Sequence, residues 1–260
     1  MHWMVFDIET VPDTELGRQL LGIDAALSDA DVAKAMSFKR LQEAETEFLP
    51  PFQHRVVAIS VLLRRDRDLH LWSLGDPDSD EAELIQRFFS GIDQNVPELV
   101  SWNGSGFDLP VLHYRAMKHR VQASMYWEQG DENRDFRYNN YLNRYHWRHI
   151  DVMDVVSAFQ PRARARLDDI AVMLGYPGKL GLSGDQVWPR YLDGDIAGIR
   201  NYCETDVLNT WLVFLRFQHM RGVLDDAALD AELERTRALL AGSDQPHLTE
   251  FLAAWQPAER

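Results

Sequence analysis

The stretch Trp3-Met4-Val5-Phe6-Asp7-Ile8-Glu9 combines a short apolar run with two acidic residues that are two positions apart. The run predicts a β-strand over roughly residues 2–8, and residues i and i+2 of a strand face the same side of its sheet. Asp7 and Glu9 would therefore present their carboxylates together. Burying two bare like charges is costly, and Mg²⁺ and Mn²⁺ relieve that cost because they take oxygen ligands. The stretch thus indicates a site for divalent cations.

Two further acidic residues stand in specific settings far along the chain. Asp108 closes the segment Asn103-Gly-Ser-Gly-Phe107-Asp108, and Asp206 closes the segment Tyr202-Cys-Glu-Thr-Asp206. Tyr202 and Asp206 are four residues apart within a predicted helix, so both side chains lie on one face of that helix. Four carboxylates in three such settings suggest a nuclease that works with two metal ions.

Length and composition favour a globular protein with a large core. The chain has 260 residues, enough for one elaborated domain or two small ones. No apolar run approaches the ~20 residues that cross a bilayer, and we expect no membrane segment. We also expect no secretory signal, because the first residues lack a basic region and a cleavage pattern. Cys203 is the only cysteine, which excludes an internal disulfide and a thiolate zinc cluster and fits a reducing, cytoplasmic location.

The net charge of −14 at pH 7 argues against broad, nonspecific coating of nucleic acid, which needs a positive surface. It does not exclude an enzyme that acts on nucleic acid. Part of the negative charge belongs to the candidate metal ligands, and bound cations reverse the local field. A free strand end also needs only a narrow cationic groove.

The order of predicted elements favours an α/β fold with a mixed sheet. After the first strand, residues 12–48 are polar and helix-prone and are interpreted as an insertion. The apolar runs 56–63 and 69–74 flank a charged turn and predict a β-hairpin. Residues 98–102 and 149–152 predict two more strands, which would run parallel to the first, with the hairpin as the antiparallel flank. Helices are predicted over residues 80–91, 108–119, 153–159, 167–174 and 196–217, with Gly91 ending the first of them.

The same pattern predicts one main domain over residues 1–222, with insertions near residues 12–50 and 121–147. From residue 225 onward the sequence predicts one or two amphipathic helices. Residues 223–260 are therefore expected to form a C-terminal helical extension.

The three acidic segments, in this order and on these elements, resemble the motifs of DEDD-type 3′–5′ exonucleases. The segments are Asp7-Ile8-Glu9-Thr10, Trp102-Asn103-Gly-Ser-Gly-Phe107-Asp108-Leu109-Pro110 and Tyr202-Cys-Glu-Thr-Asp206. More closely, residues 1–222 are similar to predicted stand-alone exonucleases related to the proofreading domain of family B DNA polymerases. The likeness includes segments 149–154, 174–179 and 202–210. It implies an RNase H-like fold, in which three parallel strands and an antiparallel hairpin are flanked by helices.

The resemblance implies that two divalent cations, Mg²⁺ or Mn²⁺, are held by Asp7, Glu9, Asp108 and Asp206. It also indicates the tyrosine variant of the family, since Asn201 stands where the other variant carries a histidine. Tyr202 is then the candidate for orienting the attacking water, because an unperturbed phenol is a poor base at neutral pH. The implied reaction is in-line hydrolysis of the terminal phosphodiester.

Contacts to the terminal nucleotide are expected, by the same resemblance, from Thr10, Asn103 and Phe107. Phe107 could stack on a base, and the alternative is a core aromatic. Lys179 lies in a glycine-rich loop that matches the family. Lys179 could either contact a phosphate or serve only to hold the loop, and the sequence does not decide between these two roles.

Aromatic and arginine residues are interleaved over residues 126–148, a mixture suited to stacking bases and holding phosphates. Arg144 and Arg148 are the leading substrate-binding candidates here, with Arg134 and Arg137 beside them. The alternative is that the segment is a packed insertion.

Together these features predict a metal-dependent 3′–5′ exonuclease that acts on single-stranded 3′ ends, DNA more than RNA. An exoribonuclease of the same superfamily is one rival, because nothing in the sequence tests for a 2′-hydroxyl. A non-catalytic nucleic-acid-binding module is another, although such a module has no use for four converging carboxylates.

Overall fold

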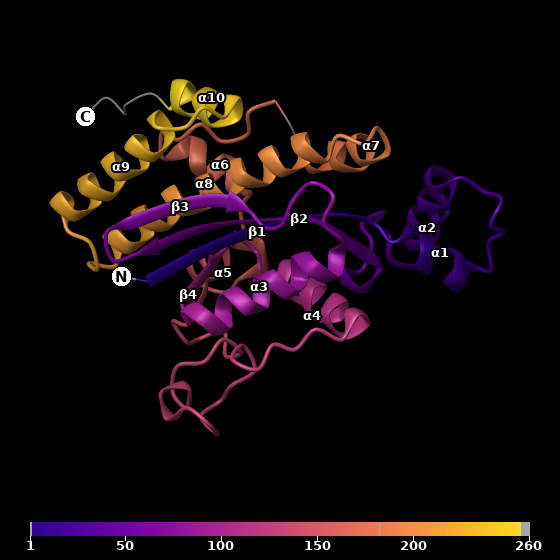
Figure 1. The fold of residues 1–260 in the computed structure, drawn as a ribbon, viewed down its shortest axis with the longest axis horizontal. Helices are drawn as coiled ribbons and strands as arrows, with labels where there is room; N and C mark the ends of the chain where they lie inside the picture. The colour runs from indigo at the N-terminus through magenta and orange to yellow at the C-terminus, as the bar shows by residue number, and fades with distance from the viewer. Residues whose placement is uncertain (1, 182, 256–260) are drawn as a thin grey trace.

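A mixed sheet forms the centre of the fold (Figure 1). The computed structural model describes residues 2–181 and 183–255. The strands are β1 (His2–Pro12), β2 (His54–Arg65), β3 (Asp68–Ser73), β4 (Glu98–Ser101) and β5 (His149–Asp151), and they are arranged in the order β3-β2-β1-β4-β5. β1, β4 and β5 are parallel, whereas β2 pairs with β1 and β3 in antiparallel fashion. The predicted α/β fold, with three parallel strands and an antiparallel hairpin, is confirmed.

The central strand β1 separates two hydrophobic cores. Trp3 and Val5 enter one of them, whereas Met4, Phe6 and Ile8 enter the other. Because side chains alternate along a strand, the acidic residues at positions 7 and 9 continue the face of Trp3 and Val5. A β-bulge between residues 9 and 10 then shifts the pairing of β1 with β2. The acidic pair therefore lies where the apolar part of that face ends.

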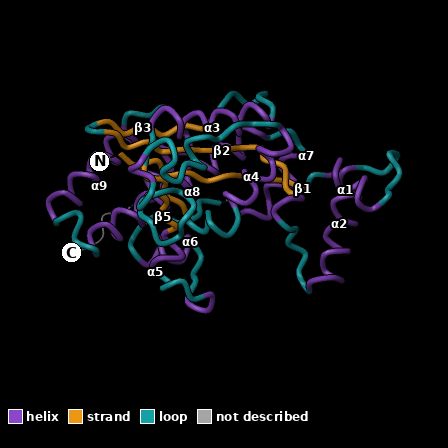
Figure 2. Tube along the Cα trace, turned by 90° about the horizontal axis from the view of Figure 1, so that it is seen from below, coloured by secondary structure: helices purple, strands orange, loops and turns teal. Residues whose placement is uncertain are grey.

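Helices cover both faces of the sheet (Figures 1 and 2). On the face of Phe6 lie α3 (Glu81–Asn95) and α4 (Asp108–His119). On the face of Trp3 lies the long helix α8 (Ile196–Met220). The remaining helices and 3₁₀ turns are α1 (Thr14–Leu21), α2 (Asp29–Ala44), η1 (Pro51–Gln53), η2 (Arg134–Phe136), α5 (Val152–Val156), η3 (Pro161–Ala163), α6 (Leu167–Met173), η4 (Gly184–Gln186), α7 (Val187–Leu192), α9 (Asp226–Ala241) and α10 (Pro246–Ala254). Among the described residues, no helix has the length and apolar character that crossing a membrane requires.

Residues 13–53, which we call the arm, project from the end of β1 beyond the sheet (Figure 1). The arm holds α1 and α2, which pack against each other around a small core of Val32, Met36 and Leu49. Both helices begin at side-chain caps, because Asp13 accepts a hydrogen bond from the Leu16 amide and the Ser28 side chain caps α2. The helix-prone stretch predicted here is confirmed as two helices.

The C-terminal helices α9 and α10 share their core with α8. Trp211 of α8 donates its indole N–H to Thr236 of α9 at 2.9 Å, and Phe251 of α10 is fully buried in the same cluster. Arg64 of β2 and Glu232 of α9 form a bidentate ion pair at 2.7 and 2.6 Å. The predicted helices of the tail are confirmed, and residues 225–255 pack as part of the main core.

Replacing Glu232 with alanine is expected to lower the free energy of unfolding by about 3–5 kcal/mol, because it leaves the Arg64 guanidinium buried without its partner. The side chains of Arg64 and Glu232 are only 4% and 6% exposed. Glu83→Ala is the matched control, since Glu83 pairs with Arg87 on an exposed helix face, and such pairs contribute about 0–1 kcal/mol. Urea denaturation of both variants measures the difference. Equal effects would mean that the buried pair adds nothing to the stability.

Several predicted boundaries differ from the structure. The helix predicted over residues 153–159 is α5, which ends at Val156, and Ala158 and Phe159 beyond it have positive φ angles of 50° and 60°. α3 continues through Gly91 to Asn95, because Ile92 is anchored in the core, and the helix ends where Val96 takes a left-handed conformation (φ 45°). β1 extends to Pro12 through its pairing with β2. The short helix α7 was not predicted at all. These features depend on tertiary contacts rather than on local sequence.

Candidate active site

Four carboxylates converge beside α8 at the end of β1. Asp7 and Glu9 come from β1, Asp108 from the first turn of α4, and Asp206 from the middle of α8. Glu9 and Asp108 are buried, while Asp7 and Asp206 are half-buried. Carboxylate oxygens of Asp7 and Glu9 lie within 4.8 Å of each other, and the charges of Asp108, Glu9 and Asp206 all raise the pKa of Asp7. The structure thus brings together the four acidic residues that the sequence singled out.

Burial and mutual repulsion raise the pKa values of these carboxyl groups. Burial is the largest cause for Asp7 and Glu9, whose pKa values lie well above the usual range, and neighbouring acidic groups add to it. Burial raises the pKa of Asp108 to about 7 and that of Asp206 to about 6. Lys179 acts in the opposite direction, because its ammonium lowers the pKa values of Glu9 and Asp206. The site therefore carries more negative charge than its protein surroundings compensate.

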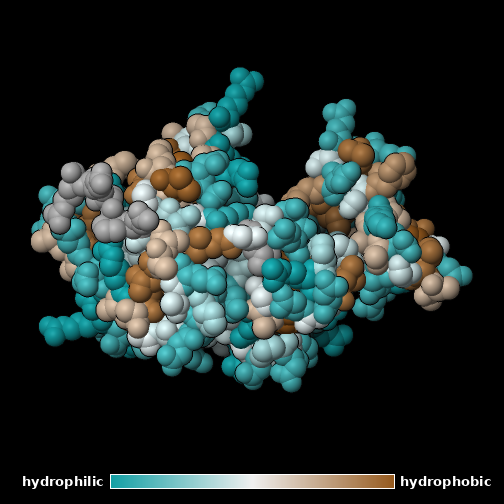
Figure 3. Space-filling model, turned by 90° about the horizontal axis from the view of Figure 1, so that it is seen from above, coloured by the Kyte–Doolittle hydropathy of each residue, from teal (hydrophilic) through white to brown (hydrophobic). Residues whose placement is uncertain are grey.

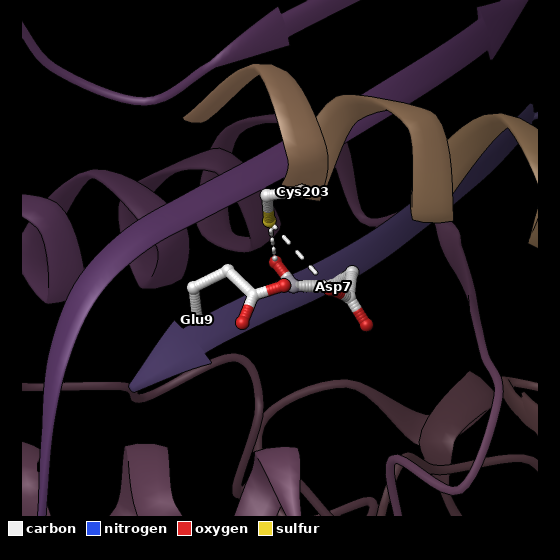
Figure 4. Close-up of side chains that lie close together, drawn as sticks. All are labelled: Asp7, Glu9 and Cys203. Carbon is white, nitrogen blue, oxygen red and sulfur yellow. Dashed lines mark hydrogen bonds between the residues drawn. The ribbon is translucent and has the colours of Figure 1, made fainter. Parts of the chain in front are cut away.

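Cys203 of α8 points at the acidic pair (Figure 4). Its thiol donates to the backbone carbonyl of Asp7 at 3.4 Å and to the Asp7 carboxylate at 3.6 Å. One ligand atom from each of Asp7, Glu9 and Cys203 lies within 4.8 Å of the others. Burial raises the pKa of the Cys203 thiol well above its usual range, so it stays protonated and acts as a donor. No role in the acidic cluster was predicted for Cys203, because no sequence signal pairs positions 7 and 203.

Tyr202 lies one helical turn before Asp206 and is buried. Burial, followed by the charges of Asp206 and Glu9, raises the pKa of its phenol far above the ordinary value. The hydroxyl therefore remains protonated at neutral pH and offers a hydrogen-bond donor at the edge of the acidic cluster. Lys179 Nζ lies 5.5 Å from the centre of the Tyr202 ring.

The loop that carries Lys179 is hydrogen-bonded to two helices, α8 and α6. Asn209 of α8 donates to the Gly178 carbonyl at 2.9 Å and accepts from the Gly178 amide at 3.2 Å. Asp168 of α6 accepts from the Lys179 amide at 2.8 Å. Gly178 has a φ of 65°, and a Cβ there would lie 2.4 Å from the Asp168 carboxylate. Asn209 lies in the segment that resembled the family, but no role was predicted for it.

A tight turn precedes Asp108. Asp151, at the end of β5, accepts hydrogen bonds from the backbone amides of Asn103 at 3.0 Å and Ser105 at 2.9 Å. Asn103 is left-handed (φ 65°), and a Cβ on Gly106 would lie 2.5 Å from the Asn103 side-chain oxygen. The turn is thereby fixed between β4 and α4, and it sets the position of Asp108.

Thr10 and Phe107 both contact His54. The His54 ring lies 2.9 Å from the Thr10 hydroxyl through Nδ1 and 3.0 Å from the Leu49 carbonyl through Nε2. Because a carbonyl only accepts, we assign the ring proton to Nε2, and the Thr10 hydroxyl then donates to Nδ1. Burial lowers the pKa of His54, which keeps the ring neutral. Phe107 is half-buried and meets the His54 ring edge-to-face at 4.9 Å.

Arg144 and Arg148 bind protein groups outside the acidic cluster. Arg144, together with Arg164, forms an ion pair at 2.7 Å with the buried Asp154 of α5. The Arg148 guanidinium lies 4.1 Å from the ring centre of the buried Phe136. Tyr126 and Tyr141 are also buried and stack on each other, so part of the segment 126–148 is packed into the core, as the alternative interpretation had it.

Comparisons with known proteins agree with the sequence motifs. Residues 46–255 match the family model described as a predicted 3′–5′ exonuclease related to the exonuclease domain of PolB. The matched region contains Asp108, Tyr202 and Asp206 and begins after Asp7 and Glu9. A search of curated proteins gives no match.

Among solved structures, the chain is similar to the family B DNA polymerase from the hyperthermophilic archaeon Pyrobaculum calidifontis, at 16% sequence identity and a TM-score of 0.49. The alignment covers 98% of this chain and 27% of the polymerase chain. The family match spans most of the chain and includes two of the three acidic segments. The chain belongs to the family of predicted 3′–5′ exonucleases related to the exonuclease domain of PolB.

Proposed function

We propose that this protein is a divalent-metal-dependent 3′–5′ exonuclease that hydrolyses the terminal phosphodiester of single-stranded nucleic acid, DNA in preference to RNA. The observation that carries the proposal is the convergence of Asp7, Glu9, Asp108 and Asp206 from three distant segments of the chain. A binding module has no need of such a cluster, whereas an enzyme that neutralises phosphate through cations does.

The residues fit a pair of Mg²⁺ or Mn²⁺ ions. All four acidic side chains offer hard oxygen donors, which these cations prefer. Burial raises the pKa values of all four groups, and the charges of the other acidic residues of the cluster add to the shift at Asp7 and Glu9, so a bound cation would stabilise the ionised forms. Asp7, Glu9, Asp108 and Asp206 would hold the ions, which when bound supply charge stabilisation and an activated water at neutral pH.

Tyr202 orients the nucleophilic water. Its hydroxyl is a donor beside Asp206 and, with a pKa far above neutrality, does not serve as the base. A hydrogen bond donated by the Tyr202 hydroxyl to the water oxygen would orient the water, so that a lone pair of that oxygen points toward phosphorus. Lys179, held by its loop next to Tyr202, places a positive charge where the scissile phosphate approaches.

The terminal nucleotide contacts Thr10, Asn103 and Phe107. The Thr10 hydroxyl already donates to His54, so its free lone pair accepts a hydrogen bond, for example from the strand's 3′-hydroxyl. Farther along the strand, the half-exposed Arg144 pairs with phosphate and Arg148 keeps the adjoining segment in place. The cytoplasm, where Cys203 stays reduced, is the proposed location.

Incubation with 5′-labelled single strands of matched DNA and RNA tests this function. With Mn²⁺ or Mg²⁺ we expect a ladder that shortens by one nucleotide at a time, faster on DNA, and no change with chelator. Release of a labelled mononucleotide at the start, or cleavage that persists in chelator, would contradict it. Cleavage of RNA alone would replace the DNA exonuclease by an exoribonuclease, and metal-independent binding without cleavage would leave a binding module.

A further inference from the structure

An exposed aromatic side chain of the arm reaches the catalytic segment. Phe48 is 60% exposed, yet its ring centre lies 5.3 Å from that of Phe107 and 5.3 Å from that of His54. Phe107 immediately precedes Asp108, and His54 is bonded to Thr10, which follows Glu9. The three rings therefore form a cluster that adjoins two of the four acidic residues.

The backbone around Phe48 is fixed from both sides. Arg40 of α2 donates to the Phe48 carbonyl at 3.3 Å. The next residue, Leu49, is buried in the core of the arm, and its carbonyl accepts from His54 at 3.0 Å. Pro50 and Pro51 then restrict the chain that enters β2. Phe48 is thus held in place while 60% of the residue remains exposed, which is the arrangement of a pre-organised contact residue.

The helices α1 and α2 of the arm project away from the body of the protein (Figure 1). Figure 3 shows the surface hollowed between the arm and the body of the protein. A strand whose last phosphodiester lies at the acidic residues must place its terminal base within reach of the residues that flank them. Phe48 is an exposed aromatic residue of the arm, and its ring contacts Phe107, the residue before Asp108.

We propose that Phe48 is a specificity-determining residue whose exposed ring stacks on the 3′-terminal nucleobase, with Phe107 packed beside Phe48 as its support. This inference rests on the proposed exonuclease function. An exposed phenylalanine stacks on any base, because each base offers a π-face. The contact therefore selects strands that carry a terminal base, without selecting its identity.

Single-turnover cleavage and equilibrium binding of two DNA strands test the role of Phe48. One strand ends in an ordinary nucleotide and the other in an abasic residue. Phe48→Ala is expected to raise the concentration needed for half-saturation about tenfold with the ordinary strand, in line with the loss of one base stack. The half-saturation concentration for the abasic strand should not change. Phe48→Trp should restore the affinity. The matched control is Phe38→Ala, since Phe38 is 61% exposed on the same arm and should have no effect on either strand.

The outcomes separate the two proposals. Equal losses on both strands, or wild-type behaviour of Phe48→Ala in an active enzyme, would overturn the stacking role alone. If the wild-type protein binds both strands but cleaves neither, the exonuclease function fails, while the contrast in binding still decides the role of Phe48. If the wild-type protein binds neither strand, both proposals fail. Thermal melting of each variant confirms that the arm remains folded.

Discussion

Asp7→Asn is expected to abolish cleavage and, in the absence of metal, to stabilise the protein. Loss of a metal ligand removes several kcal/mol of transition-state stabilisation, and each 1.36 kcal/mol corresponds to a tenfold change in rate, so the rate should fall by about 10³-fold or more. Stability should move in the opposite direction, because burial and the charges of the other three acidic residues of the cluster disfavour the ionised Asp7 carboxylate. Single-turnover cleavage and thermal melting in chelator measure the two effects.

Asp230→Asn is the matched control for Asp7→Asn. Asp230 is exposed on α9, away from the acidic cluster, and its neutralisation should change neither activity nor metal-free melting. If Asp7→Asn kept wild-type activity, the assignment of the metal ligands would be wrong. If the Asp7→Asn variant lost activity but also had a lower melting temperature than the wild-type protein in chelator, the Asp7 carboxylate would stabilise the fold instead of destabilising it.

The raised pKa values in the acidic cluster also make the stability of the metal-free protein depend on pH. The folded-state pKa values of Asp206 and Asp108 rise to about 6 and about 7, above the usual carboxyl value of about 4. Between about pH 4 and 7 the folded protein therefore binds more protons than the unfolded chain, and the contribution of these groups to stability falls as the pH rises. The stabilising effect of Asp206→Asn in chelator should accordingly be larger at pH 8 than at pH 5.

Tyr202→Phe should lower the single-turnover rate by about 10²-fold, the lower end of what a positioned catalytic group contributes. The substitution keeps the ring, its packing and the contact with Lys179, and it removes one hydroxyl. Strand binding and metal affinity should therefore stay near their wild-type values, which places the effect in the chemical step. The measurement compares the cleavage rate with equilibrium binding of a noncleavable strand.

Tyr138→Phe serves as the control, since Tyr138 is 82% exposed in the segment between α4 and β5. A full cleavage rate in Tyr202→Phe would reduce Tyr202 to a core aromatic. An equal loss in strand binding would make it a substrate contact instead.

Local sequence was sufficient for the elements that carry the acidic residues. α4 runs over Asp108–His119 as predicted, because its apolar periodicity and Pro110 in the first turn mark its start. α8 begins at Ile196 as predicted and continues three residues beyond the predicted end. The alternation along β1 placed Asp7 and Glu9 on one face without any knowledge of the rest of the fold.

The contacts around the acidic residues could not be predicted in the same way. Cys203 and Asp7 are 196 positions apart, and His54 and Thr10 are 44 apart. Each pair meets only because β2 and α8 pack beside β1. Phe48 lay in a stretch interpreted as an insertion, and its position beside Phe107 follows from the fold of the arm. Pairings of this kind depend on tertiary structure, for which a single sequence carries no periodic signal.

Calorimetric titration of Mn²⁺ into the metal-free protein tests most directly whether the four acidic residues form a metal centre. We predict two ions bound per chain, with protons released near pH 6.5 because Asp108 and Asp206 must give up protons to bind. The Asp7→Asn, Asp206→Asn double variant should lose this binding, while Asp230→Asn should retain it. Mn²⁺ binding that is the same in the double variant and the wild-type protein, or that is absent from both, would contradict the account.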